Sequence, residues 1–176
     1  MSSRATITLF LVAAGTIATL SAQNAALDYT QWRGPNRDGS AAGFVEPKAW
    51  PAQLRQRWSV PIGEGYATPL LVGPRLYTIS RRNGNEIMMA LDAATGKMVW
   101  ESSYAAPYKM NPATAPHGQG PKATPLFHDG KLFTLGISGI VSGFDAVTGK
   151  RLWQTSAPTV DRCSARRAHQ WPTAPT

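Results

Sequence analysis

Two aspartates are the first residues to consider for chemistry, because each stands in the same short context. Asp92 begins Asp-Ala-Ala-Thr-Gly-Lys97, and Asp145 begins Asp-Ala-Val-Thr-Gly-Lys150. A carboxylate of this kind could act as a general base. A reaction that needs one base would not, however, use an equivalent acid in every copy of a repeat. We therefore expect structural roles for both aspartates and for both lysines.

The other reactive side chains do not form a recognisable site. His117, His128 and His169 have no short metal-ligand spacing, and acidic residues are too sparse for a calcium cluster. The nucleophile pattern Gly-x-Ser-x-Gly is absent, and Ser138 is expected in a hairpin turn. Cys163 lies in an irregular tail with nothing to activate it. No catalytic, cofactor-binding or metal-ligating residue is predicted.

The aspartates belong to an eleven-residue pattern that occurs twice, at 90–100 and at 143–153, a spacing of 53 residues. Repetition at such a period is typical of stacked or propeller architectures, in which each unit buries its face on a neighbour. The fixed positions are Ala90, Asp92, Thr95, Gly96 and Trp100 in the first copy, and Gly143, Asp145, Thr148, Gly149 and Trp153 in the second. We expect these residues to join one unit to the next.

The repeat extends upstream, since 67–71 matches 123–127 at an offset of 56 residues. Loops are expected to absorb the difference between 56 and 53. Short runs rich in β-branched and aromatic residues predict four strands per unit. They lie near 68–72, 75–80, 86–92 and 98–103, and near 124–128, 131–136, 139–145 and 151–155. The glycines at 96 and 149 should take positive φ in a tight turn, where the preceding aspartate accepts amide hydrogen bonds.

Trp58 predicts a third, degenerate unit. It precedes Trp100 by 42 residues, close to the ~40–45 residues of one four-stranded blade, so 54–60 is expected to be the last strand of that unit. The following interval is longer because of a Pro-rich connection over 104–122.

The pattern Ala-x-Asp-x-x-Thr-Gly-Lys-x-x-Trp resembles the tryptophan-docking motif of quinoprotein-type β-propellers, the pyrroloquinoline-quinone (PQQ) repeat family. The first copy matches throughout, and the second departs only at Gly143. The segments 31–39 and 111–122 also resemble bacterial secreted members. The resemblance implies an all-β propeller of four-stranded antiparallel blades, with two to three blades present, and tryptophans that pack between blades. It does not imply PQQ, because many relatives bind none.

The chain ends suggest export and an incomplete propeller. Residues 1–22 read as a signal peptide, with Arg4 before an apolar stretch too short for a comfortable membrane span. An uncleaved anchor is the alternative. The predicted order is then an N-terminal segment at 23–53, blades at 54–159 and an irregular basic tail at 160–176. Closed propellers need about four blades or more, so we expect a truncated or frame-shifted reading of a longer gene. A genuine short protein that self-associates through open blade edges is the alternative.

The formal charge of +8 is scattered along the chain without a dense Lys or Arg run. It suits an anionic partner such as an envelope polysaccharide or lipid headgroups, while an ordinary solvated surface is the simpler reading. Envelope proteins are the other expected partners. Nucleic acid is not expected. Strand order predicts that one end of the blades gathers the loop after the second strand and the 104–122 connection. The candidate binding residues at that end are Arg81, Arg82, Asn83, His117 and Lys122.

Three functions follow from these patterns. The favoured one is an exported, periplasmic or secreted, non-catalytic propeller that acts in binding or in envelope protein assembly. The alternative is the N-terminal fragment of a PQQ-dependent alcohol or sugar dehydrogenase, where PQQ and calcium would belong only to a complete relative. The single cysteine excludes the vicinal disulfide of such enzymes. The third is the product of a non-functional gene fragment.

Overall fold

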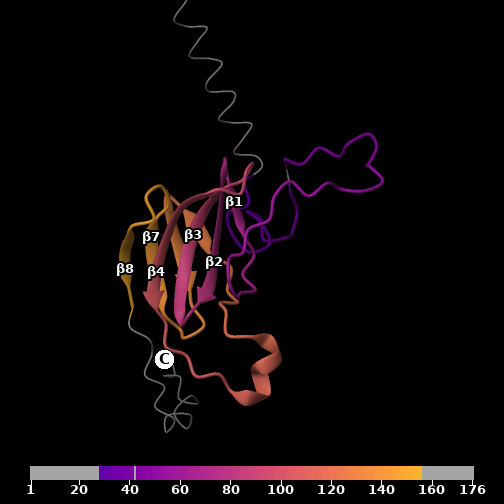
Figure 1. The fold of residues 1–176 in the computed structure, drawn as a ribbon. Coiled ribbons are helices and arrows are strands. Elements are labelled where there is room, and N and C mark those ends of the chain that lie inside the picture. Colours follow the sequence, from indigo (N-terminus) through magenta and orange to yellow (C-terminus); the bar gives the residue numbers. More distant parts are fainter. Residues whose placement is uncertain (1–27, 42, 156–176) are drawn as a thin grey trace, which may run out of the picture.

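Two four-stranded antiparallel sheets form the body of the protein (Figure 1). The structure is a computed structural model that describes residues 28–41 and 43–155. The predicted signal peptide and the basic tail lie outside the described residues. The all-β class and the four-stranded antiparallel units are confirmed, and we call the sheets blade one and blade two.

Blade one comprises four strands in sequential order, β1-β2-β3-β4. They are β1 (Leu70–Val72), β2 (Arg75–Arg82), β3 (Asn85–Asp92) and β4 (Met98–Ala105). Asn83 and Gly84, with φ of 51° and 80°, make the two-residue turn between β2 and β3. Positive φ at both central residues matches the twist of a tight hairpin. In this sheet Tyr77 pairs with Ala90, and Ala90 pairs with Trp100.

Blade two repeats this order with shorter strands, β5-β6-β7-β8. They are β5 (Leu126–His128), β6 (Lys131–Leu135), β7 (Val141–Asp145) and β8 (Arg151–Gln154). Phe133 pairs with Gly143, and Gly143 pairs with Trp153, which reproduces the register around the motif of blade one.

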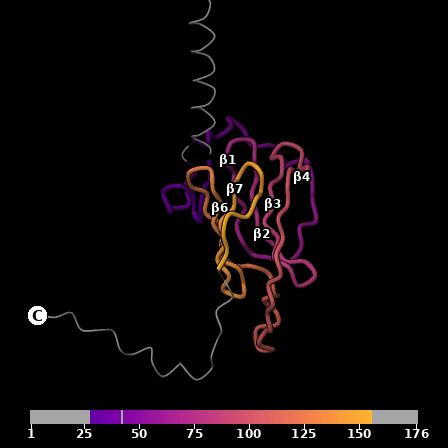
Figure 2. Tube along the Cα trace, turned by 90° about the vertical axis from the view of Figure 1, so that its left-hand side faces the viewer, coloured from indigo at the N-terminus to yellow at the C-terminus, as the bar shows by residue number. Residues whose placement is uncertain are grey.

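The core lies between the two blades, which Figure 2 shows side by side. Buried apolar residues of both sheets form one cluster that includes Tyr77, Met88, Tyr104, Leu132 and Phe144. Alternate residues of β2 and β3 face blade two, because side chains along a strand point to opposite faces of its sheet. Burial of these apolar surfaces against each other holds the blades together.

Two sequence predictions were wrong in detail. No strand forms at 54–60, although Trp58 in that stretch contacts blade one. The three-residue difference between the units is also not absorbed by a loop alone, because the strands of the central hairpin shorten by more than its turn lengthens. β2 and β3 have eight residues each, whereas β6 and β7 have five each and are joined by a longer turn at 136–140.

The segments outside the sheets are mostly irregular. Residue Tyr29 forms an isolated antiparallel bridge with Leu71, which places the start of the described chain against β1. The connection after β4 contains a short 3-10 helix, η1 (Pro112–His117), whose N-cap is Asn111. In Figure 1, η1 projects from the lower end of the blades. The β2–β3 turn also reaches this end, as the contacts described below show.

Candidate functional site

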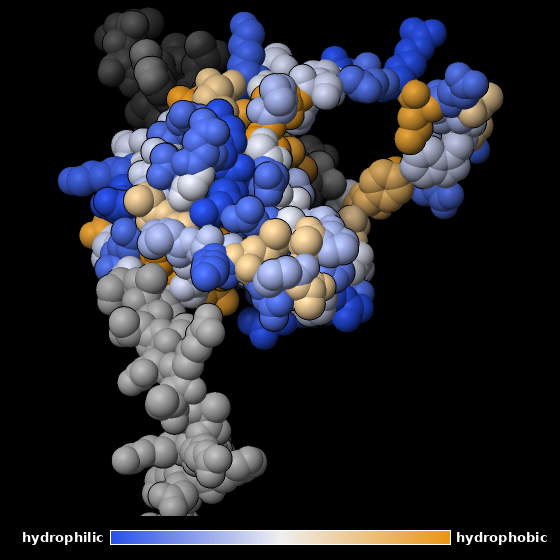
Figure 3. Space-filling model, turned by 60° about the horizontal axis from the view of Figure 1, so that its bottom comes forward, coloured by the Kyte–Doolittle hydropathy of each residue, from blue (hydrophilic) through white to orange (hydrophobic). Residues whose placement is uncertain are grey.

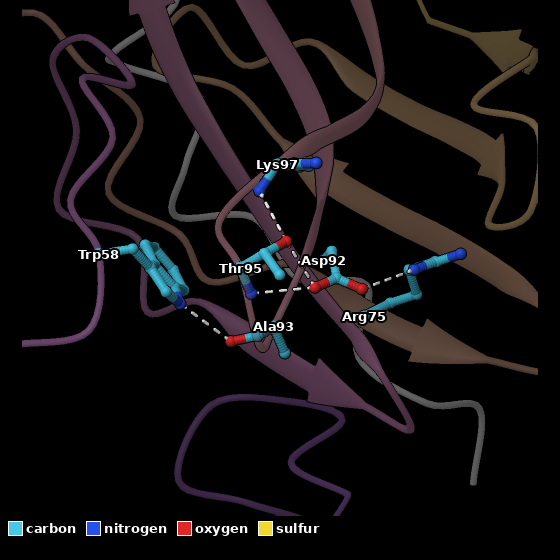
Figure 4. Close-up of polar contacts among 6 residues, drawn as sticks. All are labelled: Trp58, Arg75, Asp92, Ala93, Thr95 and Lys97. Atoms are coloured by element: carbon cyan, nitrogen blue, oxygen red, sulfur yellow. Dashed lines mark hydrogen bonds and ion pairs between the residues drawn. The ribbon is translucent and has the colours of Figure 1, made fainter.

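The motif turn of blade one is a closed hydrogen-bonded loop (Figure 4). The carboxylate of Asp92 accepts hydrogen bonds from the backbone amide and the hydroxyl of Thr95, at 2.9 and 2.7 Å. The amide of Gly96 donates to the backbone carbonyl of Asp92 at 2.8 Å, with a φ of 71° at Gly96. Arg75 lies 3.5 Å from the other carboxylate oxygen. The carboxylate is thus occupied in holding the turn.

The turn of blade two has the same geometry. The carboxylate of Asp145 accepts from the Thr148 amide and hydroxyl at 2.8 and 2.7 Å, and φ at Gly149 is 72°. In both turns the hydrogen bond from the threonine hydroxyl lowers the pKa of the aspartate below its ordinary value. A lowered pKa and hydrogen bonds to the groups of its own turn suit a structural carboxylate better than a general base.

Each motif turn receives a tryptophan from the preceding part of the chain. The Trp58 indole donates to the carbonyl of Ala93 at 3.1 Å, and the Trp100 indole donates to the carbonyl of Ala146 at 3.1 Å. A Cβ added at Gly149 would lie 2.5 Å from the Trp100 ring, and one added at Gly96 would lie 2.7 Å from the Trp58 ring. The glycines therefore give both the turn and the surface on which the indole rests.

The second copy of the motif differs in its tryptophan. Trp153 is 44% exposed, and its indole N–H has no hydrogen-bond partner in the part of the chain that the structure describes. Its ring lies beside Phe133, with centroids 6.2 Å apart, and fills the space that a Cβ at position 143 would take. Gly143 in place of the first motif alanine thus lets this ring lie against its own blade.

The candidate binding residues at the other end of the blades gather around two pockets. Arg81, Arg82 and Asn83 line a pocket of about 420 Å³ together with Glu64 and Gln119. His117 and Lys122 line a second pocket, of about 480 Å³, with Tyr66 and Tyr108. The β2–β3 turn and the long connection thus meet at one end of the molecule. Figure 3, turned so that this end comes forward, shows a mainly hydrophilic surface with apolar patches.

The segment 63–66 joins the two pockets, and sequence reasoning missed it. Glu64 and Arg81 exchange two backbone hydrogen bonds, at 2.9 and 2.8 Å, and the Tyr66 amide donates to the carbonyl of Pro121 at 2.9 Å. A third pocket, of about 460 Å³, extends from Gly63 to Tyr66 and shares lining residues with both of the others. The glycines on either side of Glu64 were the available signal, because such a segment allows close backbone approach.

The second pocket combines aromatic rings with a cation. The Lys122 ammonium lies 4.4 Å from the centroid of the Tyr66 ring and donates to the carbonyl of His117 at 2.6 Å. The pocket can therefore accept an apolar or aromatic group beside a positive charge.

A buried glutamate is the other residue that the sequence did not reveal. Glu86 on β3 has no exposed surface. Its carboxylate accepts from the Tyr104 hydroxyl at 2.7 Å and from the Ile137 amide of blade two at 2.6 Å. Burial, and then the hydrogen bond to Glu86, raise the pKa of Tyr104. Glu86 thus joins the two blades near the pockets, and blade two has no equivalent glutamate.

Within 28–41 and 43–155, no three His, Cys, Asp or Glu side chains lie close enough together to hold a metal ion. Calcium needs about six to eight oxygen ligands, so the described residues do not offer a calcium site of their own. No helix of the described chain is long and apolar enough to span a membrane.

Comparisons with solved structures give partial matches. The chain is 26% identical to BamB from Moraxella catarrhalis, with a TM-score of 0.40, and the match covers 56% of this chain and 26% of that one. It is 26% identical to a europium-containing methanol dehydrogenase, with a TM-score of 0.40, over 57% of this chain and 18% of that one. A quinohemoprotein alcohol dehydrogenase from Pseudomonas putida HK5 is 22% identical, with a TM-score of 0.38, over 57% and 14%.

The chain thus spans about a quarter or less of the length of these proteins. No curated protein sequence matches it significantly. The family model described as outer membrane protein assembly factor BamB matches residues 18–169. Since that match covers most of the chain, the protein belongs to the PQQ-like repeat family of the assembly factor BamB.

Proposed function

We propose that this protein is a non-catalytic binding module of the bacterial cell envelope, periplasmic or secreted, that contacts proteins during envelope assembly. The observation that carries the proposal is the meeting of three segments, 63–66, 81–84 and 108–122, around adjoining pockets at one end of the blades. Binding groups usually lie on loops that a rigid scaffold positions. The family description, an outer membrane protein assembly factor, supports an envelope protein as the partner.

The repeated motif supports the non-catalytic part of the proposal. Both aspartates accept turn hydrogen bonds through one carboxylate oxygen, and their recurrence in the same turn of each blade fits a structural role better than that of a single general base. We propose that binding requires neither PQQ nor calcium. Reduction of a dye by the purified chain that depends on added PQQ and calcium would contradict this part and favour the dehydrogenase alternative.

Site-specific photo-crosslinking in the producing cells tests the binding surface. A benzoyl-phenylalanine in place of Tyr108 lies in the second pocket and should form adducts with envelope proteins, identified by mass spectrometry. The matched control replaces Lys97, an exposed residue of a motif turn at the other end of the blades. Equal adducts from both positions, none from Tyr108, or adducts with polysaccharide alone would contradict the proposal.

Export is tested on the same cells. The first 22 residues predict a mature chain that begins at Gln23. N-terminal sequencing of the protein from the periplasmic and extracellular fractions should find this residue. A chain that keeps Met1 and stays in the cytoplasm would contradict an envelope function.

A further inference from the structure

The pocket at the end of β2 contains two arginines with unsatisfied nitrogens. Arg81 is only 8% exposed, and its Nη1 atom is buried without a hydrogen-bond partner among the described residues. The Nε atom of Arg82 is likewise buried without a hydrogen-bond partner among the described residues. Both side chains line the pocket of about 420 Å³. Buried polar atoms normally find a partner, so these two donors indicate a missing acceptor.

The cross-strand candidate acceptor for Arg81 is engaged elsewhere. Arg81 and Glu86 are direct cross-strand neighbours, and both are buried. The Glu86 carboxylate instead accepts from Tyr104 and Ile137, and no ion pair within 4.0 Å joins it to Arg81. A buried cation without a paired anion is costly, and a bound anion would remove that cost.

The remaining lining residues favour a singly charged, planar anion. Asn83 and Gln119 add side-chain amides to the two arginines. Glu64 lines the same pocket, Glu101 pairs with Arg82 Nη2 at 2.6 Å, and Glu86 is the cross-strand neighbour of Arg81, so three carboxylates lie near the two guanidinium groups. A doubly charged phosphate would meet repulsion from these carboxylates. A single carboxylate suits the planar fork of an arginine.

We propose that this pocket binds the side-chain carboxylate of an acidic peptide segment, with an adjacent apolar residue of that segment in the Tyr66–Tyr108 pocket. The two pockets are joined along 63–66 by a third that contacts both, which gives a continuous path for an extended chain. This inference names the chemistry of the partner and rests on the proposed binding function.

The test is a titration of the full chain with two blocked tripeptides, acetyl-Gly-Glu-Gly-amide and acetyl-Gly-Gln-Gly-amide. Binding is followed through the NMR signals of the arginine Nε–H groups at constant ionic strength. The glutamate peptide should shift the Arg81 and Arg82 signals saturably, and the glutamine peptide should not. Equal shifts from both peptides, or tighter binding of inorganic phosphate, would overturn the proposal.

Two variants make the test specific. Arg82→Gln removes a charged donor, and Gln119→Glu adds a repelling carboxylate at a half-buried lining position, so each should weaken binding of the glutamate peptide roughly tenfold or more. The matched control is Arg57→Gln, an equal charge change at an exposed position outside the pocket, which should leave binding unchanged. Equal loss in the control would mean that only net charge matters.

The outcome separates this inference from the function on which it rests. If the original chain does not bind the glutamate peptide, while Arg82→Gln still crosslinks from position 108 at the original yield, the carboxylate site is rejected and the binding surface is kept. Specific peptide binding without envelope adducts would keep the site and reject the envelope function.

Discussion

Blade one and blade two are alike at one end and different at the other. At the motif end the same five residue types, Asp, Ala, Thr, Gly and Lys, give the same turn, with nearly equal hydrogen-bond lengths around Asp92 and Asp145. At the other end, blade one has eight-residue strands and a two-residue turn, whereas blade two has five-residue strands and the turn at 136–140. The motif end is therefore the same in the two blades, and the end that lines the pockets differs.

Glu86 of blade one meets blade two at the longer turn. The Ile137 amide in this turn donates to its carboxylate at 2.6 Å. Glycine at position 136 suits this contact, because a Cβ there would overlap the carboxylate. The turn that differs between the blades is thus also the turn that contacts a buried acid of the other blade.

The largest expected effect is a loss of folding stability that should differ between the two motif tryptophans, Trp100 and Trp153. Trp100→Ala should lower the free energy of unfolding by about 3–5 kcal/mol, because it empties a contact between the blades. Trp153→Ala should cost only about 1 kcal/mol, since Trp153 is 44% exposed. Urea denaturation of the two variants measures the difference, with the exposed Trp32→Ala as control. Equal losses from Trp100→Ala and Trp153→Ala would contradict the assignment.

The next largest effect on stability is expected at Glu86, which only blade one has. Glu86→Ala leaves the buried Tyr104 hydroxyl and the Ile137 amide without their acceptor, and should cost about 3 kcal/mol. Glu101→Ala, which removes an exposed ion pair with Arg82, should cost less than about 1 kcal/mol. Hydrogen exchange at the Ile137 amide should quicken only in Glu86→Ala. Unchanged exchange there would mean that Glu86 does not hold the hairpin.

The sequence predicted what the two blades share and missed what only one has. The motif turns and the strand positions were predictable because the residues recur at fixed offsets. Glu86 and Glu64 occur once, so no repeat indicated them, and their importance depends on contacts to segments far along the chain. The strand at 54–60 was predicted wrongly because Trp58 resembles the motif while its neighbours find no strand partner among the described residues.

A smaller effect depends on high pH and on Tyr104. Burial raises the pKa of Tyr104, so the folded state holds the phenol proton more tightly than the unfolded state does. The stability from this group is complete below the unfolded pKa of 10.0 and is lost as the pH rises above it. Tyr104→Phe should therefore show a weaker decline in unfolding free energy between about pH 9 and 11. An unchanged alkaline decline would show that Tyr104 does not cause it.

The smallest expected effect is a shift in the pKa of each motif aspartate, which should be equal in the two blades. Thr95→Val removes the hydroxyl that lowers the pKa of Asp92, and Thr148→Val does the same for Asp145. Each variant should raise the pKa of its own aspartate towards 3.8 and leave the other unchanged. In the original chain the stability from these carboxylates is present above pH 3.8 and is lost as the pH falls through the lowered values. NMR titration of the two carboxyl groups measures both shifts, and unequal shifts would show that the turns differ.

The direction of the tryptophan contacts has a consequence for how such a chain can change by duplication. Trp58 reaches forward to the turn of blade one, and Trp100 reaches forward to the turn of blade two. Blade one therefore both receives an indole and supplies one. A duplicated copy of blade one would keep an indole beside each motif turn, whereas an insertion within the motif would separate the two. Change in the loops at the opposite end is limited by the contact between Glu86 and the Ile137 amide, which also joins the blades.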